Sequence, residues 1–402
     1  MPFAFPTSSR LLGVVALCLS VSAPAFAATL KDALDHAWAA SAATQTARTQ
    51  QFDADDMAAR AWLPGPPTVS VSGKTDQLDR NDGLREWEAE VAVPLWLWGQ
   101  RERAAAVAQA GRTAGAQRFM LERWQLAGAL RDAWWDTRLA QAELDAARRK
   151  LDAANRLETD AGKRLKAGDI SPFDANLARL SRQQSQAELL RATMMAAKAE
   201  SAFAALSRGA ALPEPQETDA PANASLDTHP QLLSLIATVA AARARLQQAG
   251  GDTRDNPELA LTVTRERSGN SEAYQNLAKL TLKLPLGTET RNRPRVAAAN
   301  AELAEAEQAL ETAHIQVRAA YEASRLELDQ ARSEQALQQE RQLLAEQNLL
   351  WQQQANRAGQ VDLAALLRAQ AEADEARLQV TRARINVGRM ISRTNQAAGV
   401  LP

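Results

Sequence analysis

The sequence VAVPL occupies residues 91–95, and a related sequence, LKLPL, occupies residues 282–286. The prolines of these two sequences are 191 residues apart. A second pair, KAGDI at residues 166–170 and RAGQV at residues 357–361, has its glycines at the same separation. Landmarks that share one register indicate an internal duplication, so we expect two equivalent halves along the chain.

Each half contains an expected helix, a pair of strands, a long helix, a glycine turn and a second long helix. Residues 209–228 join the halves, and three prolines stand there among acidic and polar residues, as in a linker. The predicted division is a signal peptide at 1–27, a first repeat at 28–208, the linker at 209–228 and a second repeat at 229–402. Within the repeats we expect β-hairpins at 67–98 and 257–287, and helical hairpins with tips near residues 168 and 359.

The second strand of each hairpin alternates between apolar and polar residues. Apolar residues alternate with Glu86, Glu88 and Glu90 in the first half, and leucines alternate with Lys279 and Lys283 in the second. Such alternation places one face of a strand in an apolar medium and the other in water. Strands of ~10 residues suit a tilted membrane crossing, although a half-buried hairpin of a soluble protein has the same pattern. The five charged residues are candidates for a lumen-facing surface, and the ordinary wet side of a strand is the alternative.

Residues 100–166 contain no proline and few glycines, which predicts one uninterrupted helix. At ~1.5 Å per residue its length approaches ~100 Å, which exceeds what a globular domain can use. Ser171 and Pro172 follow the turn at Gly168 and predict the start of a return helix that ends near residue 207. The second half predicts a helix from Pro294 to residue 357 and a return helix from residue 362 to about residue 392.

The composition of the chain excludes several classes of function. Among its 402 residues, 47 Lys and Arg balance 48 Asp and Glu, so there is no basic surface for a nucleic acid. One cysteine, Cys18, and three scattered histidines cannot form a disulfide framework or a zinc site, and phosphate-binding glycine motifs are absent. We therefore expect no cofactor, no metal site and no catalytic residues.

The N-terminal residues have the pattern of a cleaved secretory signal. Arg10 precedes an apolar stretch at residues 11–21, and the sequence AFA at residues 25–27 has the small residues that signal peptidase recognises. The apolar stretch is shorter than the ~20 residues that cross a bilayer as a helix. The bulky Leu17 before Cys18 disfavours lipid attachment at that cysteine. We therefore expect export to the periplasm or the outer membrane.

Four strands cannot close a barrel by themselves. An open sheet edge cannot lie in hydrocarbon, because its backbone groups would have no hydrogen-bond partner. If the expected strands cross a membrane, several chains must each contribute four strands to one barrel. The smallest such barrels have ~8 strands, so a dimer and a trimer both remain open.

An exported chain with two such halves resembles the TolC-type outer-membrane efflux proteins, and the resemblance covers essentially the whole mature chain. The sequence PLWLWGQR at residues 94–101 and the compact length are most similar to the CzcC-like heavy-metal branch. The resemblance implies a mainly α fold with a transmembrane β portion: a homotrimer with a barrel of four strands per chain, continued by a long periplasmic α-helical barrel. It further implies a passive exit duct in outer-membrane lipid, which works with a periplasmic adaptor and an inner-membrane resistance-nodulation-division pump. The expected substrates are divalent heavy-metal cations.

The resemblance also assigns roles to the two helical tips. Docking of the adaptor would fall to ten residues: Ala167, Gly168, Asp169, Ile170, Ser171, Ala358, Gly359, Gln360, Val361 and Asp362. In TolC, acidic residues six and nine positions after the second glycine ring the entrance, but Ala365 and Arg368 occupy those positions here. Asp169, Asp174 and Asp362 remain as candidates for an acidic ring at the tips, and solvated charges at helix ends are the alternative.

Other interpretations of the same sequence remain open. A duct of this fold could serve multidrug efflux or type I secretion, and the chain could instead be a soluble periplasmic coiled-coil scaffold. Trp62, Trp96 and Trp98 are candidates for a membrane interface, where indole rings are favoured. We expect Trp134 and Trp135, together with Trp124, to pack between helices.

Overall fold

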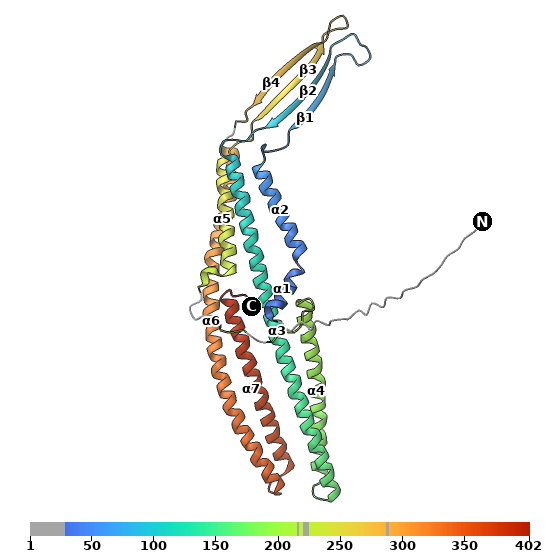
Figure 1. The fold of residues 1–402 in the computed structure, drawn as a ribbon, viewed down its shortest axis with the longest axis vertical. Helices are drawn as coiled ribbons and strands as arrows, with labels where there is room; N and C mark the ends of the chain where they lie inside the picture. The colour runs from blue at the N-terminus through green and yellow to red at the C-terminus, as the bar shows by residue number, and fades with distance from the viewer. Residues whose placement is uncertain (1–28, 215–216, 220–224, 287–288) are drawn as a thin grey trace, which may run out of the picture.

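The computed structural model of the chain describes residues 29–214, 217–219, 225–286 and 289–402. It is elongated, with a four-stranded sheet at one end and two long helical hairpins at the other (Figure 1). None of the described helices has a segment that is long and apolar enough to cross a membrane. The predicted signal peptide at 1–27 lies outside the described residues.

The two halves contain matching elements in the same order. The first half consists of α1 (Leu30–Ala39), α2 (Ala42–Arg60), β1 (Thr68–Thr75), β2 (Arg85–Pro94), α3 (Gln100–Ala167) and α4 (Pro172–Leu206). The second half consists of a short 3-10 turn (Leu226–Thr228), α5 (Pro230–Gly251), β3 (Glu258–Arg267), β4 (Gln275–Lys283), α6 (Glu289–Arg357) and α7 (Leu363–Ala397). The outgoing helices α3 and α6 have 68 and 69 residues, and both return helices have 35. The structure therefore repeats one helical hairpin almost residue for residue.

The four strands form a single antiparallel sheet in the order β1-β2-β3-β4. Strand β2 pairs with β3 along its whole length, with Val91 opposite Leu261, so the two halves share one sheet. Within the described residues, β1 has a strand partner only on its β2 side and β4 only on its β3 side. Both outer edges of the sheet therefore keep unpaired backbone groups.

Two strands and two helices differ in extent from the prediction. Helix α7 ends at Ala397 rather than near residue 392. The expected alternation continued past Pro94 to Leu97, whereas β2 ends at Pro94 and the chain turns into α3 through Gly99. Gly99 has φ 69°, a left-handed conformation that glycine adopts without steric cost. In the second half, β4 ends at Lys283, before Pro285. Helix α6 starts at Glu289 rather than at the expected Pro294, so Pro294 lies inside the helix, where it cannot donate a hydrogen bond.

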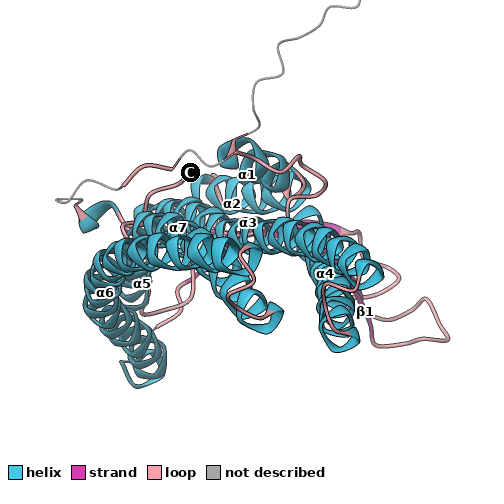
Figure 2. Ribbon diagram, turned by 90° about the horizontal axis from the view of Figure 1, so that it is seen from below, coloured by secondary structure: helices cyan, strands magenta, loops and turns pink. Residues whose placement is uncertain are grey.

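The long helices lie side by side in a curved layer. Figure 2, viewed along the helices, shows α6, α7, α3 and α4 following one arc, with α1 on its convex side. Small side chains allow the helices to lie close together: Ala140, Ala147, Ala154 and Ala161 of α3 are buried at intervals of seven residues. At the lower end, Ala161 packs with Ala178 of α4 and Leu363 of α7. An alanine seam with this spacing is typical of coiled-coil packing.

The largest apolar core lies halfway along the molecule, where α1 meets α3. It contains Leu34 of α1, Leu130, Trp134 and Trp135 of α3, and Phe203 of α4. The indole of Trp134 donates a hydrogen bond to the carbonyl of Pro213 (2.8 Å), which attaches the linker to α3. The expected packing role of Trp134 and Trp135 is confirmed, since they are 1% and 7% exposed.

A buried charged network lies beside this core. Arg131 of α3 is 2% exposed and forms an ion pair with Glu217 of the linker (2.6 Å). Arg131 also donates to the side chain of Gln396 and to the carbonyl of Val400, and Ser392 donates to Glu217. The network therefore joins α3, the linker, α7 and the end of the chain. The network could not be predicted from the sequence, because its members come from three distant segments and have no common spacing.

Candidate channel wall and helical tips

One face of the sheet is apolar across three consecutive cross-strand rows. The rows are Val71–Ala89–Val263–Ala278, Val69–Val91–Leu261–Leu280 and Val93–Leu259–Leu282. These side chains lack cover in a single chain: Val69, Val71 and Leu280 are each 70% exposed. Contiguous exposed apolar surface of this kind marks a lipid or protein interface.

The opposite face of the sheet is polar. Glu86, Glu88, Glu90, Lys279 and Lys283, which were predicted as lumen-facing candidates, all lie on this face. Thr262 donates to Glu90 (3.1 Å), and the Lys283 ammonium lies 4.0 Å from Glu90. This face therefore carries both signs of charge and is compatible with water, whereas the three apolar rows on the reverse face carry no charge. Alternation of period two produces both faces from the same strands.

The two helical tips have the same backbone geometry. Gly168 and Gly359 have φ 81° and 74°, so each outgoing helix ends on a left-handed glycine. At the first tip, the amide of Asp169 donates to the carbonyl of Arg164 (2.9 Å), and at the second, Gln360 donates equivalently to Ala355 (2.9 Å). These bonds satisfy carbonyls that a helix end otherwise leaves unpaired.

Each return helix begins with a side-chain cap. Ser171 accepts a hydrogen bond from the amide of Asp174 (3.1 Å), as predicted from the sequence, and Pro172 occupies the first turn. Asp362 accepts from the amide of Ala365 (2.8 Å) at the start of α7. All ten predicted tip residues thus lie in two matched turns at the same end of the molecule (Figure 1).

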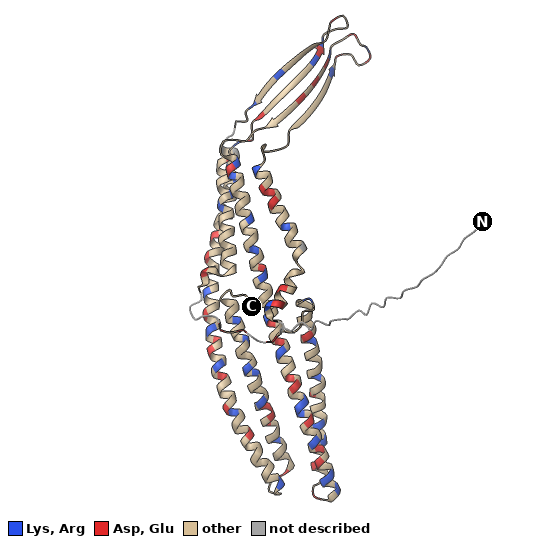
Figure 3. Cartoon of the chain, in the orientation of Figure 1, with Lys and Arg blue, Asp and Glu red and all other residues tan. Residues whose placement is uncertain are grey.

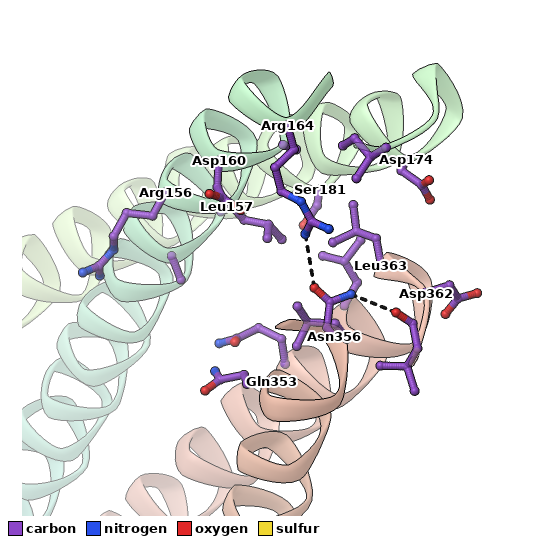
Figure 4. Close-up of a pocket in the computed structure, with 18 of the residues that line it drawn as sticks. Arg156, Leu157, Asp160, Arg164, Asp174, Ser181, Gln353, Asn356, Asp362 and Leu363 are labelled. Carbon is purple, nitrogen blue, oxygen red and sulfur yellow. Dashed lines mark hydrogen bonds between the residues drawn. The ribbon is translucent and has the colours of Figure 1, made fainter. Parts of the chain in front are cut away.

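A groove of about 830 Å³ separates the two hairpins just above these tips. Arg164 points across it toward the side-chain oxygen of Asn356 (3.4 Å), and Asn356 donates to the carbonyl of Val361 (3.0 Å; Figure 4). Its charged lining is mixed: Lys150, Arg156, Arg164, Arg357, Asp160, Asp169, Asp174, Asp362 and Asp374. The contact between Arg164 and Asn356 could not be predicted from the duplication, because their equivalent positions hold different residue types.

Ion pairs within each hairpin hold the two helices together near the groove. In the first hairpin, Lys150 of α3 pairs with Glu188 of α4 (2.6 Å). In the second, Glu346 of α6 accepts hydrogen bonds from Gln342 (3.0 Å) and from Arg377 of α7 (2.8 Å), and these two bonds lower the pKa of the Glu346 carboxyl. The same contact raises the pKa of Arg377. Both hairpins are therefore stabilised from within, by different residues.

Comparison with solved structures identifies this architecture. The outer membrane protein VceC of Vibrio cholerae is similar with a TM-score of 0.74 at 15% identity, covering 92% of this chain and 96% of VceC. CusC is similar with a TM-score of 0.71 at 16% identity, covering 92% of each chain. The open-state MtrE outer membrane channel of Neisseria gonorrhoeae has a TM-score of 0.70 at 16% identity, covering 92% of this chain and 89% of MtrE. The chain has the fold of TolC-type outer-membrane channels.

Sequence comparison agrees with the TolC-type fold. Residues 222–393 match the model of the family described as outer membrane efflux protein. The cobalt-zinc-cadmium resistance protein CzcC of Cupriavidus metallidurans is 28% identical over 232 residues, which cover 55% of this chain and 54% of CzcC. The matched region thus spans about half the length of this curated relative. The expected resemblance to the TolC-type efflux family, and to CzcC within it, is confirmed.

The candidate acidic residues are not gathered into one cluster within a single chain. Asp174 and Asp362 lie at the starts of α4 and α7, and Figure 4 shows both carboxyl groups pointing away from the Arg164–Asn356 contact. Asp169 is exposed at the first tip. Asp362 caps its helix and Asp174 accepts a hydrogen bond from the Ser171 hydroxyl (2.7 Å), so each has a local structural role. An acidic ring therefore requires copies of the chain to be brought together.

The positions that are acidic in TolC have no acidic character here. Ala365 is half-buried in the first turn of α7, and Arg368 is exposed and donates to the backbone carbonyl of Ala364 (3.3 Å). In the described part of the chain, no three His, Cys, Asp or Glu side chains come together in a way that could hold a metal ion.

The three tryptophans at the base of the sheet differ in their exposure and contacts. Trp62 is 82% exposed and Trp98 is fully exposed, where the strands join the helices. Trp96 instead donates its indole hydrogen bond to the carbonyl of Ala61 (3.1 Å) and is half-buried. Trp62 and Trp98 therefore remain candidates for a membrane interface, while Trp96 fixes the junction.

Proposed function

We propose that this protein is the outer-membrane channel component of a tripartite efflux system, in which it acts as a passive exit duct. The observation that carries this proposal is the two-sided sheet: three exposed apolar rows on one face and a charged face on the other. A sheet of this kind suits lipid outside and water inside. Fold similarity to outer membrane channels and the efflux family match support the same assignment.

The unpaired edges support an assembly of several chains. Strands β1 and β4 end the four-stranded sheet, and their free backbone groups need partners before the sheet can enter hydrocarbon. Pairing β1 of one copy with β4 of the next closes a barrel, and a homotrimer supplies twelve strands. The curved helical layer of each chain then forms one third of a tube below the barrel (Figure 2).

The matched tips are proposed to dock a periplasmic adaptor. Residues 167–171 and 358–362 present two turns of the same geometry per chain, so three chains present six similar turns. An inner-membrane resistance-nodulation-division pump would supply the energy, since the chain itself has no nucleotide-binding motif. The adaptor and the pump are recognised by this end of the molecule in the proposed assembly.

Divalent heavy-metal cations are the proposed substrates. The support is the similarity to CzcC, whose name records resistance to cobalt, zinc and cadmium. The described polar face has five carboxylates (Glu86, Glu88, Glu90, Glu258 and Glu266) and three ammonium groups (Lys74, Lys279 and Lys283), which favours cations over anions. A conduit needs no tight metal ligands, because tight binding would oppose release.

Deletion of the gene in its host tests the function and the substrate together. Growth inhibition is measured with zinc, cadmium, cobalt, nickel and copper, and with a panel of hydrophobic drugs and detergents. Metal hypersensitivity that the intact gene rescues is the expected result. Hypersensitivity to drugs alone would contradict the metal substrate and leave the duct in place. Fractionation tests the duct itself, since release of the protein in osmotic-shock fluid without detergent would support a soluble scaffold instead.

A further inference from the structure

The apolar face of the sheet becomes basic at the end away from the helices. Beyond the three apolar rows, Trp87 lies opposite Arg265, and in the next row Arg85 lies opposite Arg267. All four side chains belong to the same face as Val69 and Leu261. Figure 3 shows both basic and acidic residues on the strands near the loops that connect them, and the strand register assigns the three arginines to this face.

These three arginines have no acidic partner among the described residues. The guanidinium groups of Arg265 and Arg267 lie 4.7 Å and 5.1 Å from the centre of the Tyr274 ring. Arg267 also donates to the carbonyl of Asn81 (2.9 Å), while its buried Nε has no hydrogen-bond partner. The polar face differs, because Lys283 there pairs with Glu258 (3.4 Å). Two of the three lysines on the polar face, Lys74 and Lys283, thus lie beside carboxylates, whereas the three arginines on the other face do not.

Unpaired arginines on this face need a physical compensation. Like charges directly opposite each other on neighbouring strands are destabilising. A charged side chain on the lipid face is costly at the bilayer centre and much less so near the interface, so this end of the sheet belongs at an interface. An anion that bridges the arginines removes the repulsion, and guanidinium groups bind phosphate oxygens in pairs.

We propose that Arg85, Arg265 and Arg267 bind the phosphate groups of an anionic lipid in the leaflet around the loop end of the sheet. The inference rests on the proposed function, since it needs the apolar face to lie in a membrane. The three apolar rows contact the acyl chains, and Trp87 and Tyr274 lie at the level of the headgroups. The arginines then fix the depth of the sheet and select phosphorylated lipid around it.

Lipid binding by the purified full-length protein tests the proposal. The protein is reconstituted in phosphatidylcholine vesicles that contain bis-phosphorylated lipid A or lipid A without its phosphates, and retained lipid is counted by native mass spectrometry. The test variant is Arg85→Gln/Arg265→Gln, which leaves Arg267 on its loop contact with Asn81. The matched control, Lys74→Gln/Lys279→Gln, removes the same charge from the polar face of the same sheet.

The expected result is about a tenfold weaker affinity of the arginine variant for phosphorylated lipid A, with the lysine variant unchanged. Equal losses in the two variants, or equal binding of lipid A with and without phosphates, would overturn the proposal. Inorganic phosphate that displaces the lipid at matched concentration would show a free-anion site and overturn the lipid assignment.

Flotation with vesicles of phosphatidylcholine alone separates this inference from the proposed function. The wild-type chain and both variants are expected to float, because the apolar rows are intact in all three. A wild-type chain that does not float would contradict the membrane duct, and the lipid contact with it. A chain that floats but does not distinguish phosphorylated from dephosphorylated lipid A would overturn the lipid contact alone.

Discussion

The two helical hairpins have the same backbone but different surroundings. At the tips, Gly168 and Gly359 have equivalent conformations and hydrogen bonds. Halfway along the helices the correspondence ends: Trp134 is buried in α3, whereas Arg325 stands exposed at the equivalent position of α6. Helix α3 lies inside the curved layer and α6 at its end (Figure 2). A duplicated backbone is thus specified by its turns and caps, while the side chains of the helices follow their position in the layer.

The largest expected effect comes from removing the core that only the first hairpin has. Trp134→Ala should lower the free energy of unfolding by about 4 kcal/mol, because it leaves a large cavity. Leu326→Ala, one residue beyond the equivalent position of α6, should change the unfolding of a single chain by less than about 0.5 kcal/mol, because Leu326 is 71% exposed. Chemical denaturation followed by circular dichroism in detergent measures both.

Leu326→Ala also tests the assembly. Leu326 lies on the free side of α6, so its truncation should weaken association of the copies even though the fold is retained. Light scattering across a dilution series measures the oligomer. A substitution that changed the folding of the chain as strongly as Trp134→Ala would show that α6 is covered within one chain, and would remove the contrast between the hairpins.

The next largest loss of stability is expected from disrupting the buried charged network around Arg131. Arg131→Met should cost about 3 kcal/mol, because it leaves the Glu217 carboxylate without its partner in a mostly buried site. The equivalent position in α6 is the exposed Glu322, and Glu322→Gln should cost less than about 0.5 kcal/mol. The same denaturation experiment compares them. Similar costs for the two would mean that the network contributes no more than a surface charge.

Much of this architecture was predictable because local chemistry determines it. Glycine at residues 168 and 359, Ser171 followed by proline, and strand alternation each act over a few residues. The helix starting at Gln100 lies where the pattern placed it, and β3 lies within the hairpin expected at residues 257–287. The predicted start of α6 at Pro294 is wrong, because proline often begins a helix but here lies inside one.

The rest depends on contacts between distant segments. The pairing of β2 with β3 joins the two halves, and the sequence of neither strand predicts that the other is its partner. The same holds for Arg131 with Glu217 and for Arg164 with Asn356. These pairs combine residue types that are common on any exposed helix, so only the three-dimensional arrangement distinguishes them.

Substitutions at the two helical tips test whether the tips are equivalent, and their expected cost in stability is smaller. Gly168→Ala and Gly359→Ala should each cost about 1 kcal/mol, because alanine is strained at positive φ and both sites have open space around them. Gly162→Ala is the matched control, since Gly162 is helical and equally unobstructed, and this variant should be slightly stabilised. Costs that differ strongly between the two tips would show that one tip is held by contacts that the other lacks.

The smallest effect concerns the helices that precede the strands. The side chain of His229 caps α5 by accepting a hydrogen bond from the amide of Gln231 (3.2 Å), whereas Ser41 makes no such bond at the start of α2. Burial lowers the pKa of His229 from its ordinary 6.5. The folded chain therefore binds this proton less readily than the unfolded chain, and stability should fall as pH drops below about 6.5.

His229→Asn keeps a capping side chain that cannot titrate. Thermal unfolding measured from neutral to mildly acidic pH should then lose the part of its pH dependence that comes from His229. An unchanged pH profile in this variant would assign the dependence to other groups. Ser41→Ala should leave the profile as it is in the wild type, because Ser41 neither titrates nor caps its helix through its side chain.

The open edges of the sheet have a consequence for inheritance. In the proposed trimer each copy uses both β1 and β4, so no copy can be absent or defective at either edge without leaving the ring open. A cell that makes the normal chain beside one damaged in β1 would place damaged copies in most of its assemblies. Mutations at the two outer strands should therefore be dominant over the normal gene, whereas mutations that prevent folding altogether should be recessive.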